Sequence, residues 1–351
     1  MFYYIHIPFC KSKCKYCSFA SFAGIDDKIE QYLDFLKEEI REFLEENGGE
    51  KIESIYFGGG TPSVLNVAQI DDIISIFREY GSLENTEITL EANPENVNEE
   101  YAIGLKEIGI NRISIGIQSL NNKTLQEIGR SENKVIFEAL GNLKKVEFEN
   151  IGVDFIIGLP YVAKGEIKKD LEKIINENNN IKHVSLYMLE QGNYPKNWAE
   201  ISLKKDDYLE EYEQVVNFLE SKGFTHYEIS NFAKTGAECR HNKSYWNHSN
   251  YRGFGLNASS FIGNKRFTNG KNFSNYYAKK LEFEEILEEK DLKIECIMFG
   301  LRTFNLSQDL VENKQKLDEF IKDGLLEKDG NKIKPTNSGI AILDYITQNL
   351  I

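Results

Sequence analysis

The stretch MFYYIHIPFCKSKCKYC, residues 1–17, joins a strand-like run directly to three closely spaced cysteines. Residues 3–8 are rich in aromatic and β-branched side chains, which favour a β-strand. Cys10, Cys14 and Cys17 follow with the spacing C-x3-C-x2-C. Because so short a loop can reach only one place in a folded protein, we expect the three thiols to bind the same centre.

The three cysteines alone leave two kinds of centre open. A structural zinc ion normally takes four protein ligands, and the fourth would have to be Cys239, Cys296 or a histidine such as His6. A [4Fe-4S] cluster held by three cysteines leaves one iron free for another ligand. The chain has 5 cysteines, and their uneven spacing is not that of a disulfide framework. The spacing does not decide between zinc and a cluster.

A glycine-rich turn, GGGTP at residues 58–62, follows the predicted strand at residues 52–57. A tight turn needs one glycine, whereas three let a ligand approach backbone N–H and C=O groups without meeting a Cβ atom. Pro62 then fixes the direction in which the chain leaves the turn. This pattern favours a small polar ligand.

Strand-like runs and amphipathic segments alternate along the first two thirds of the chain. The predicted strands are residues 3–8, 52–57, 87–91, 112–117, 153–157 and 184–189. Residues 27–46 and 67–80 carry apolar side chains at helical spacing, and a helix at 206–222 and a strand at 225–229 follow. The alternation predicts an α/β fold with a parallel sheet covered by helices. Six units are too few for a closed eight-stranded barrel, so an open partial barrel and a doubly wound sheet both remain.

Polar residues stand at or near the carboxyl ends of four predicted strands, where ligands of parallel α/β sheets bind. They are Glu91, Gln118, Asp154 and Tyr187. Each of them alone is more often a turn former or a helix cap than a ligand contact. Together with the cysteines and GGGTP they predict one pocket.

The composition changes after residue 230. Residues 230–275 are rich in Asn, Gly, Ser and aromatic side chains without a sustained period, which predicts a loop-rich extension. Between positions 234 and 271 seven basic residues face one acidic residue, so this stretch carries +6 in a chain of net charge −14. Cations interleaved with aromatic rings suit a flat macrocycle that bears carboxylates, although they also suit RNA or a nucleotide.

The last part of the chain, residues 283–351, reads as helix, turn, short hairpin and helix, the outline of a winged-helix-like unit. The whole chain has 351 residues, with 42 Lys and Arg against 56 Asp and Glu. This acidic balance disfavours nucleic acid as a partner, so we interpret the unit as a packing module. No apolar run approaches the ~20 residues that span a bilayer. The first residues lack the features of a signal peptide, which predicts a cytoplasmic protein.

The motifs together resemble a known family. C-x3-C-x2-C with Tyr16 before the last cysteine, followed by GGGTP, resembles the radical S-adenosylmethionine (SAM) superfamily. Further phrases resemble its oxygen-independent coproporphyrinogen oxidase-like branch: IHIPFC, GGGTPS, EANP, ISIGIQS, IGR, DFIIGLP, HYEISNF and HNKSYW. They extend to about residue 261, roughly three quarters of the chain.

The resemblance implies a partial (β/α)6 barrel as the radical SAM core at residues 1–230. An extension at 231–282 would carry HNKSYW, and the winged-helix-like domain would occupy 283–351. Cys10, Cys14 and Cys17 would hold a [4Fe-4S] cluster whose open iron binds SAM. The positions expected to contact SAM are Tyr4, Tyr16, Gly59, Gly60, Thr61, Glu91, Gln118, Arg130 and Asp154.

Two departures distinguish this chain within the branch. The coproporphyrinogen oxidases carry a fourth cysteine two residues after the triplet, where this chain has Phe19, and a long arm before the cluster, where it has nine residues. The motif HNKSYW and the short beginning instead resemble the HemW-type haem chaperones. We therefore expect a chaperone that binds cluster, SAM and haem as cargo. It would pass haem to an acceptor protein, such as a membrane respiratory enzyme, to which it would bind peripherally.

Several alternatives accompany this expectation. A true enzyme, either an oxygen-independent coproporphyrinogen III oxidase or a radical SAM methyltransferase, is the first, and a zinc-binding module is the second. His241 is either an axial ligand of haem iron or a hydrogen-bonding anchor for its loop. We expect Cys239 to be a buried packing residue, and we expect His6 to form a hydrogen bond beside the cluster without itself being a ligand. A homodimer is compatible with the sequence, although no pattern requires one.

Overall fold

The structure is a computed structural model that describes residues 1–190 and 194–351. Six neighbouring parallel strands form its central wall, in the order β1-β4-β5-β6-β7-β8. Their bounds are β1 Phe2–Ile7, β4 Ser54–Gly59, β5 Glu87–Ala92, β6 Arg112–Gln118, β7 Ile151–Ile157 and β8 Ile181–Met188. All six strands predicted from the sequence are present, so the parallel βα arrangement is confirmed.

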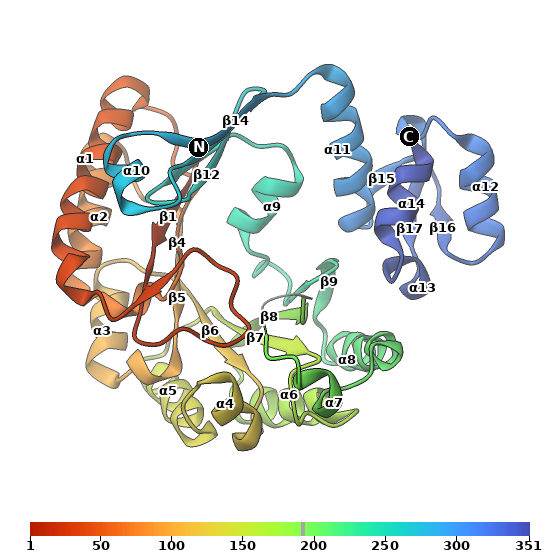
Figure 1. The fold of residues 1–351 in the computed structure, drawn as a ribbon, viewed down its shortest axis with the longest axis horizontal. Coiled ribbons are helices and arrows are strands. Elements are labelled where there is room, and N and C mark those ends of the chain that lie inside the picture. Colours follow the sequence, from red (N-terminus) through yellow and green to blue (C-terminus); the bar gives the residue numbers. More distant parts are fainter. Residues whose placement is uncertain (191–193) are drawn as a thin grey trace.

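Helices surround the outer face of this curved wall (Figure 1). They are α1 Ile29–Asn47, α2 Val67–Tyr80, α3 Glu99–Glu107, α4 Asn122–Ile128, α5 Asn133–Lys145, α6 Glu166–Glu177 and α8 Tyr208–Ser221, with the short α7 Trp198–Ile201. Helix α2 has the predicted bounds, and its capping box at Asn66 and Gln69 explains why it starts there. Within the described residues no helix is both long and apolar enough to cross a membrane.

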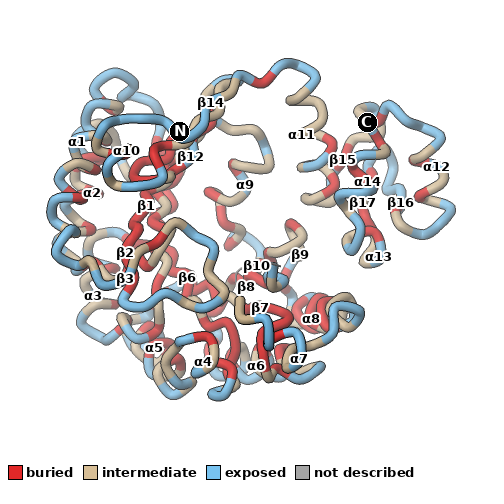
Figure 2. The backbone as a smooth tube through the Cα atoms, in the orientation of Figure 1, coloured by how far each residue is buried: buried red, intermediate tan, exposed pale blue. Residues whose placement is uncertain are grey.

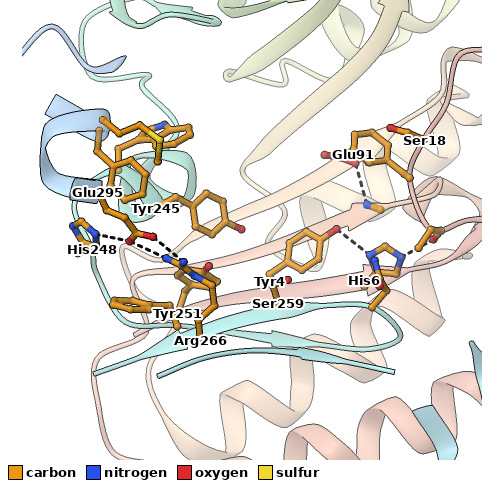
Figure 3. Close-up of a pocket in the computed structure, with 18 residues that line it drawn as sticks. Tyr4, His6, Ser18, Glu91, Tyr245, His248, Tyr251, Ser259, Arg266 and Glu295 are labelled. Carbon is orange, nitrogen blue, oxygen red and sulfur yellow. Dashed lines mark hydrogen bonds and ion pairs between the residues drawn. The ribbon is translucent and has the colours of Figure 1, made fainter. Parts of the chain in front are cut away.

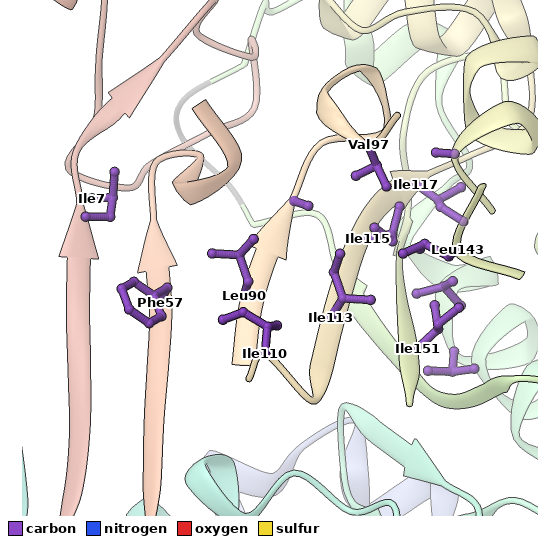
Figure 4. Close-up of a cluster of buried hydrophobic side chains, with 14 of the residues drawn as sticks. Ile7, Phe57, Leu90, Val97, Ile110, Ile113, Ile115, Ile117, Leu143 and Ile151 are labelled. Carbon is purple, nitrogen blue, oxygen red and sulfur yellow. The ribbon is translucent and has the colours of Figure 1, made fainter. Parts of the chain in front are cut away.

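Side chains alternate between the two faces of the wall because successive residues of a strand point in opposite directions. The outward positions are apolar and bury against the helices (Figure 4). Much of the strand backbone is accordingly coloured as buried in Figure 2. Phe57, Leu90, Ile113 and Phe155 are each fully buried there. The alternate positions are mostly polar and face the hollow of the barrel. This second face forms the candidate site.

The sheet continues beyond the parallel wall at both edges, into an open twelve-stranded sheet. At one edge β8 pairs with β10 (Asn231–Ala233), which pairs with β9 (Thr225–Glu228). At the other edge β1 pairs in parallel with β11. Strand β11 spans Tyr251–Phe254, and three strands joined in antiparallel fashion complete this edge: β12 Ser259–Ile262, β13 Lys265–Asn269 and β14 Leu281–Ile286.

The extension therefore contains more regular structure than its composition predicts. Its strands have 3–6 residues and are separated by Asn- and Gly-containing turns. Most side chains of β14 are exposed, so no alternation marks this strand in the sequence. Helix α9 (Arg240–Trp246) carries the HNKSYW motif and lies on the inner side of the wall (Figure 1), and α10 (Phe273–Tyr277) follows β13.

The C-terminal part has a hydrophobic cluster of its own. The cluster consists of Ile297, Leu301, Leu306, Val311, Leu317, Phe320, Leu326, Ile333, Ile346 and Leu350. The elements around it are α11 Glu289–Arg302, β15 Leu306–Ser307, α12 Lys314–Lys322, β16 Leu326–Asp329, β17 Lys332–Pro335, α13 Asn337–Ile340 and α14 Leu343–Leu350. The order of helix, hairpin and helix agrees with the winged-helix-like outline.

Candidate functional site

A cavity with a volume of about 670 Å³ lies between the inner face of the barrel, the extension and α11 (Figure 3). We call it the mouth cavity. Its barrel side includes Tyr4, Gly59 and Glu91, and its opposite side includes His248 and Glu295. Side chains from parts of the chain nearly 300 residues apart thus meet around one space.

The cysteine loop lies beside this cavity. Cys10 is buried at the end of β2 (Phe9–Cys10), which pairs with β3 (Phe22–Ala23), whereas Cys14 and Cys17 are half-buried. The Thr61 hydroxyl donates to Cys10 Sγ over 3.4 Å, and burial raises the pKa of the Cys10 thiol. The glycine turn and the cysteine loop are therefore in direct contact.

Gly60 shows why the turn needs glycine. A Cβ atom at this position would lie 2.8 Å from the Phe9 carbonyl oxygen and 3.1 Å from Cys10 Sγ, which is too close. At Gly59 the backbone φ is +112°, and a Cβ would lie 2.5 Å from the His6 ring. Both residues let the turn pass close to the cysteine loop.

The donor set of the loop suits a cluster. Three thiols are soft ligands, which zinc and iron–sulfur clusters both accept. A tetrahedral zinc ion would bring its sulfur ligands to within about 3.8 Å of one another. Within residues 1–190 and 194–351, no three His, Cys, Asp or Glu side chains are placed so as to hold a single metal ion. The three thiols of the loop have the donor chemistry of a [4Fe-4S] cluster that leaves one iron open.

Glu91 is a carboxylate on the barrel side of the mouth cavity. It accepts a hydrogen bond from the Tyr56 hydroxyl at 2.8 Å and one from the Gly59 N–H at 3.3 Å. Removal from water nevertheless raises its pKa to about 7. A cationic group entering the cavity would favour the ionised form and would be bound by it in return.

Tyr4 and His6 form the strand-one side of the site. The Tyr4 hydroxyl lies 3.1 Å from His6 Nδ1, while His6 Nε2 lies 2.8 Å from the Ala20 carbonyl oxygen on the cysteine loop. Burial lowers the pKa of His6 to about 4, so the ring is neutral at neutral pH. His6 thus supports the cysteine loop with one nitrogen and Tyr4 with the other.

Asp154 and Gln118 occupy the neighbouring strands. Asp154 accepts a hydrogen bond of 3.1 Å from the Ser114 hydroxyl, and burial raises its pKa. Gln118 ends β6 with a left-handed φ of +69°, at a shift in the register with β7. A Cβ at Gly116 would lie 2.9 Å from Gln118 Nε2, so this glycine leaves room for the amide.

Arg130 lies apart from Glu91, in a separate cavity of about 270 Å³ that also includes Cys14. Its guanidinium donates to Asn93 Oδ1 at 2.7 Å, to the Gly116 carbonyl oxygen at 3.1 Å and to the Tyr16 hydroxyl at 3.1 Å. Arg130 thus supplies a cation beside Cys14, and its charge favours the ionised form of Asp154.

His241 is held from both sides. Its Nδ1 lies 2.7 Å from the Ser54 hydroxyl and its Nε2 lies 2.8 Å from the Tyr245 hydroxyl. The ring is 1% exposed, and burial lowers its pKa to about 3. With both nitrogens engaged, this geometry favours the anchoring role over the role of axial ligand. Cys239 is buried as expected, with its pKa raised to about 12 by burial.

Sequence analysis missed three residues on the far side of the mouth cavity. Arg266 forms a two-pronged ion pair with Glu295 of α11, at 2.8 and 2.9 Å, and Glu295 also lies 2.9 Å from His248 Nε2. These contacts join three parts of the chain, namely strand β13, the turn that follows α9, and helix α11. A single glutamate on an amphipathic helix carries no signal in the sequence, because such residues are usually solvent-exposed.

Comparison with known proteins places this geometry in context. Residues 4–174 match the Radical SAM superfamily. The heme chaperone HemW of Lactococcus lactis subsp. lactis (strain IL1403) is 34% identical over 99% of this chain and 96% of the relative. The heme chaperone HemW of Bacillus subtilis (strain 168) is 33% identical over 85% of this chain and 82% of the relative.

A solved structure shares the fold. Coproporphyrinogen III oxidase (HemN) from Escherichia coli, a radical SAM enzyme, superposes with a TM-score of 0.86 at 22% identity, covering 99% of this chain and 89% of that chain. At this identity the likeness establishes the architecture alone. It confirms the predicted fold class.

Proposed function

The chain belongs to the radical SAM superfamily and, within it, to the family of the heme chaperone HemW, and on this premise we propose that it is itself a haem chaperone. It binds a [4Fe-4S] cluster, SAM and haem, and it transfers haem to an acceptor protein. The observation that carries the proposal is the mouth cavity of about 670 Å³, which lies beside the cysteine loop and is rich in aromatic side chains.

The cavity suits a flat macrocycle. Its volume lies within the range of roughly 300–1,000 Å³ that is usual for organic ligands. The aromatic rings of Tyr245, Trp246, Phe261 and Phe299 line it, and the Arg266 guanidinium adds a cation. Aromatic surfaces bind a porphyrin plane, while a cation favours its propionates.

The cofactor residues have separable tasks in this proposal. Cys10, Cys14 and Cys17 would hold the cluster, and a reduced cluster supplies the electron for cleavage of SAM when both are bound. Glu91 would bind the cationic amino group of SAM and Arg130 its carboxylate. The remaining proposed SAM contacts are Tyr4, Tyr16, Gly59, Gly60, Thr61, Gln118 and Asp154.

The three parts of the chain then divide the work. Residues 1–230 would hold the cofactors, and residues 231–282 would supply aromatic rings and Arg266 to the haem cavity. Residues 283–351 would close the cavity through α11, whose Glu295, Met298 and Phe299 line it. The ion pair between Arg266 and Glu295 supports this division because it ties the second part to the third.

The acceptor and the setting complete the proposal. Haem would be delivered to a respiratory enzyme of the membrane by a protein that works in the cytoplasm and meets the membrane only at transfer. The half-buried cysteines Cys14 and Cys17 would also allow two copies to meet over the cluster, as a homodimer.

The test is anaerobic reconstitution with iron and sulfide, followed by separate incubations with haem and with coproporphyrinogen III. Each incubation contains SAM and a reductant. We expect stoichiometric haem binding and no protoporphyrinogen. Formation of protoporphyrinogen would show that the chain is an oxidase despite Phe19 at the position of the fourth cysteine.

A further inference from the structure

A third cavity, of about 200 Å³, lies deeper in the barrel. We call it the floor cavity. Tyr4, Glu91 and Tyr245 line both cavities, so the floor cavity adjoins the mouth cavity. Its own wall includes Arg112 at the start of β6 and His183 of β8, neither of which has a task in the function proposed above.

Arg112 is a buried cation without hydrogen-bond partners for much of its guanidinium. The residue is 2% exposed, and its Nε and Nη1 atoms have no partner in the structure. Among the described residues it forms no ion pair with a carboxylate oxygen within 4.0 Å. A buried guanidinium is normally paired, because leaving its N–H groups unsatisfied is unfavourable. The arrangement therefore points to a missing acceptor.

His183 presents a second unpaired nitrogen to the same space. The residue is 1% exposed, its Nε2 lies 2.8 Å from the Tyr227 hydroxyl, and its Nδ1 has no partner. Gly152 shows that the two groups converge. A Cβ built there would lie 3.4 Å from His183 Nδ1 and 3.5 Å from Arg112 Nη2. The absence of a side chain at this position keeps that space free.

The nearby carboxylates are already engaged. Glu87, whose charge favours that of Arg112, accepts from the Cys239 thiol and from two backbone N–H groups at the start of α9. Asp154 accepts from the Ser114 hydroxyl, and burial raises its pKa. The N–H groups of Arg112 thus remain available to an acceptor from outside the chain.

We propose that the floor cavity is a carboxylate-binding subsite, in which Arg112 and His183 bind the carboxylate of an organic ligand that occupies the adjoining mouth cavity. Arginine forms two parallel hydrogen bonds to a carboxylate, and a neutral His183 that accepts from Tyr227 has an Nδ1–H to donate. The inference rests on the proposed function in one respect, because that function places haem in the mouth cavity and so supplies the carboxylate, a haem propionate. The carboxylate of SAM is assigned there to Arg130.

The experiment compares acids with analogues that lack the carboxylate. Haem and haem dimethyl ester form one arm, and SAM and decarboxylated SAM form the other. Dissociation constants are measured by titration for the reconstituted wild type, for Arg112→Met and for Arg240→Met. Arg240 is the matched control because it lies near the surface and lines neither cavity. If the Met variant does not fold, Arg112→Lys replaces it, because lysine keeps the charge but cannot form two parallel hydrogen bonds to a carboxylate.

We expect Arg112→Met to weaken binding of haem about tenfold or more, to leave binding of haem dimethyl ester and of SAM within about twofold, and to leave Tm equal or higher. A loss of affinity for SAM with unchanged affinity for haem would overturn the assignment of the subsite to haem. Unchanged affinity for both acids in a folded Arg112 variant would overturn the subsite and leave a water-filled cavity. If the wild type binds neither acid, the proposed function fails. The subsite is then still tested by whether sodium propionate raises the Tm of wild type more than that of Arg112→Met, and equal shifts would overturn it.

Discussion

The outer and inner faces of the same parallel strands are built differently. Phe57, Leu90 and Phe155 point outward, are fully buried and belong to the main hydrophobic core. Glu91 and Arg112, on the inner face, line cavities. The outer face buries apolar side chains in the hydrophobic core, whereas the inner face contains buried polar atoms without hydrogen-bond partners.

This difference separates stability from function within single strands. Apolar burial on the outer face stabilises the fold by about 25 cal/mol per Å² of surface removed from water. Unsatisfied polar groups on the inner face lower stability, and proteins retain such groups where ligands bind. Substitutions on the two faces should therefore have opposite signatures, and the predictions below test this contrast.

The largest expected effect is the loss of the cluster when a cysteine of the loop is replaced. Cys14→Ala should remove all visible absorbance of the reconstituted cluster, because only three cysteines are available in the loop. Since Cys14 is half-buried, the free energy of unfolding should change by less than about 1 kcal/mol. Absorbance spectra and urea denaturation measure the two effects, with Cys296→Ala as the control. A retained cluster spectrum would contradict the assignment.

Truncation of the outer face should chiefly affect stability. Phe57→Ala should lower the free energy of unfolding by about 3–5 kcal/mol, because it leaves a cavity among fully buried neighbours. Thr89→Val is the matched inner-face variant, since the buried Thr89 hydroxyl has no partner. That change should be neutral or stabilising. Equal losses in the two variants, measured by urea denaturation, would break the contrast between the faces.

Glu91 should make stability depend on pH. Its pKa is about 7 in the folded protein against 4.5 normally, so the folded state retains a proton that the unfolded state has lost between these values. The free energy of unfolding should therefore fall as pH rises from 4.5 to 7, by up to about 3 kcal/mol. Glu91→Gln should lack this component. Parallel pH profiles for the two proteins would mean that Glu91 titrates normally.

The smallest predicted effect concerns His241. His241→Ala removes the partner of the Ser54 and Tyr245 hydroxyls and should cost about 1–3 kcal/mol of stability. Because neither ring nitrogen is free, the wavelength of the haem absorbance maximum should stay unchanged. A shifted maximum together with unchanged stability would restore the axial-ligand hypothesis.

The parallel wall could be predicted from sequence because its signals are local. Near-continuous apolar runs mark the strands, and the amphipathic period marks α2 to the residue. The strands after residue 250 have no such signal. Strand β11 pairs with β1, so that Phe2 lies opposite Tyr251, a residue far away in the sequence. Such pairing depends on the rest of the fold rather than on the local sequence.

The candidate site likewise has a part that could be predicted from the sequence and a part that could not. The cysteines and GGGTP could be expected to meet because they follow neighbouring strands, and Thr61 does contact Cys10. The role of His241 could not be decided, since one of its partners, Ser54, is 187 residues away. Arg112 was overlooked although it begins an otherwise largely apolar strand, because the sequence does not reveal whether a buried cation has a partner.

The most direct test of the central claim is haem transfer. The reconstituted protein is loaded with one equivalent of haem, separated from free haem, and mixed with membranes that contain a haem-free respiratory enzyme. The account predicts that haem absorbance moves from the chain to the membrane fraction, faster than from serum albumin loaded equally, while the chain remains intact. Haem that stays on the chain, or that moves no faster than from albumin, would contradict the assignment as a chaperone.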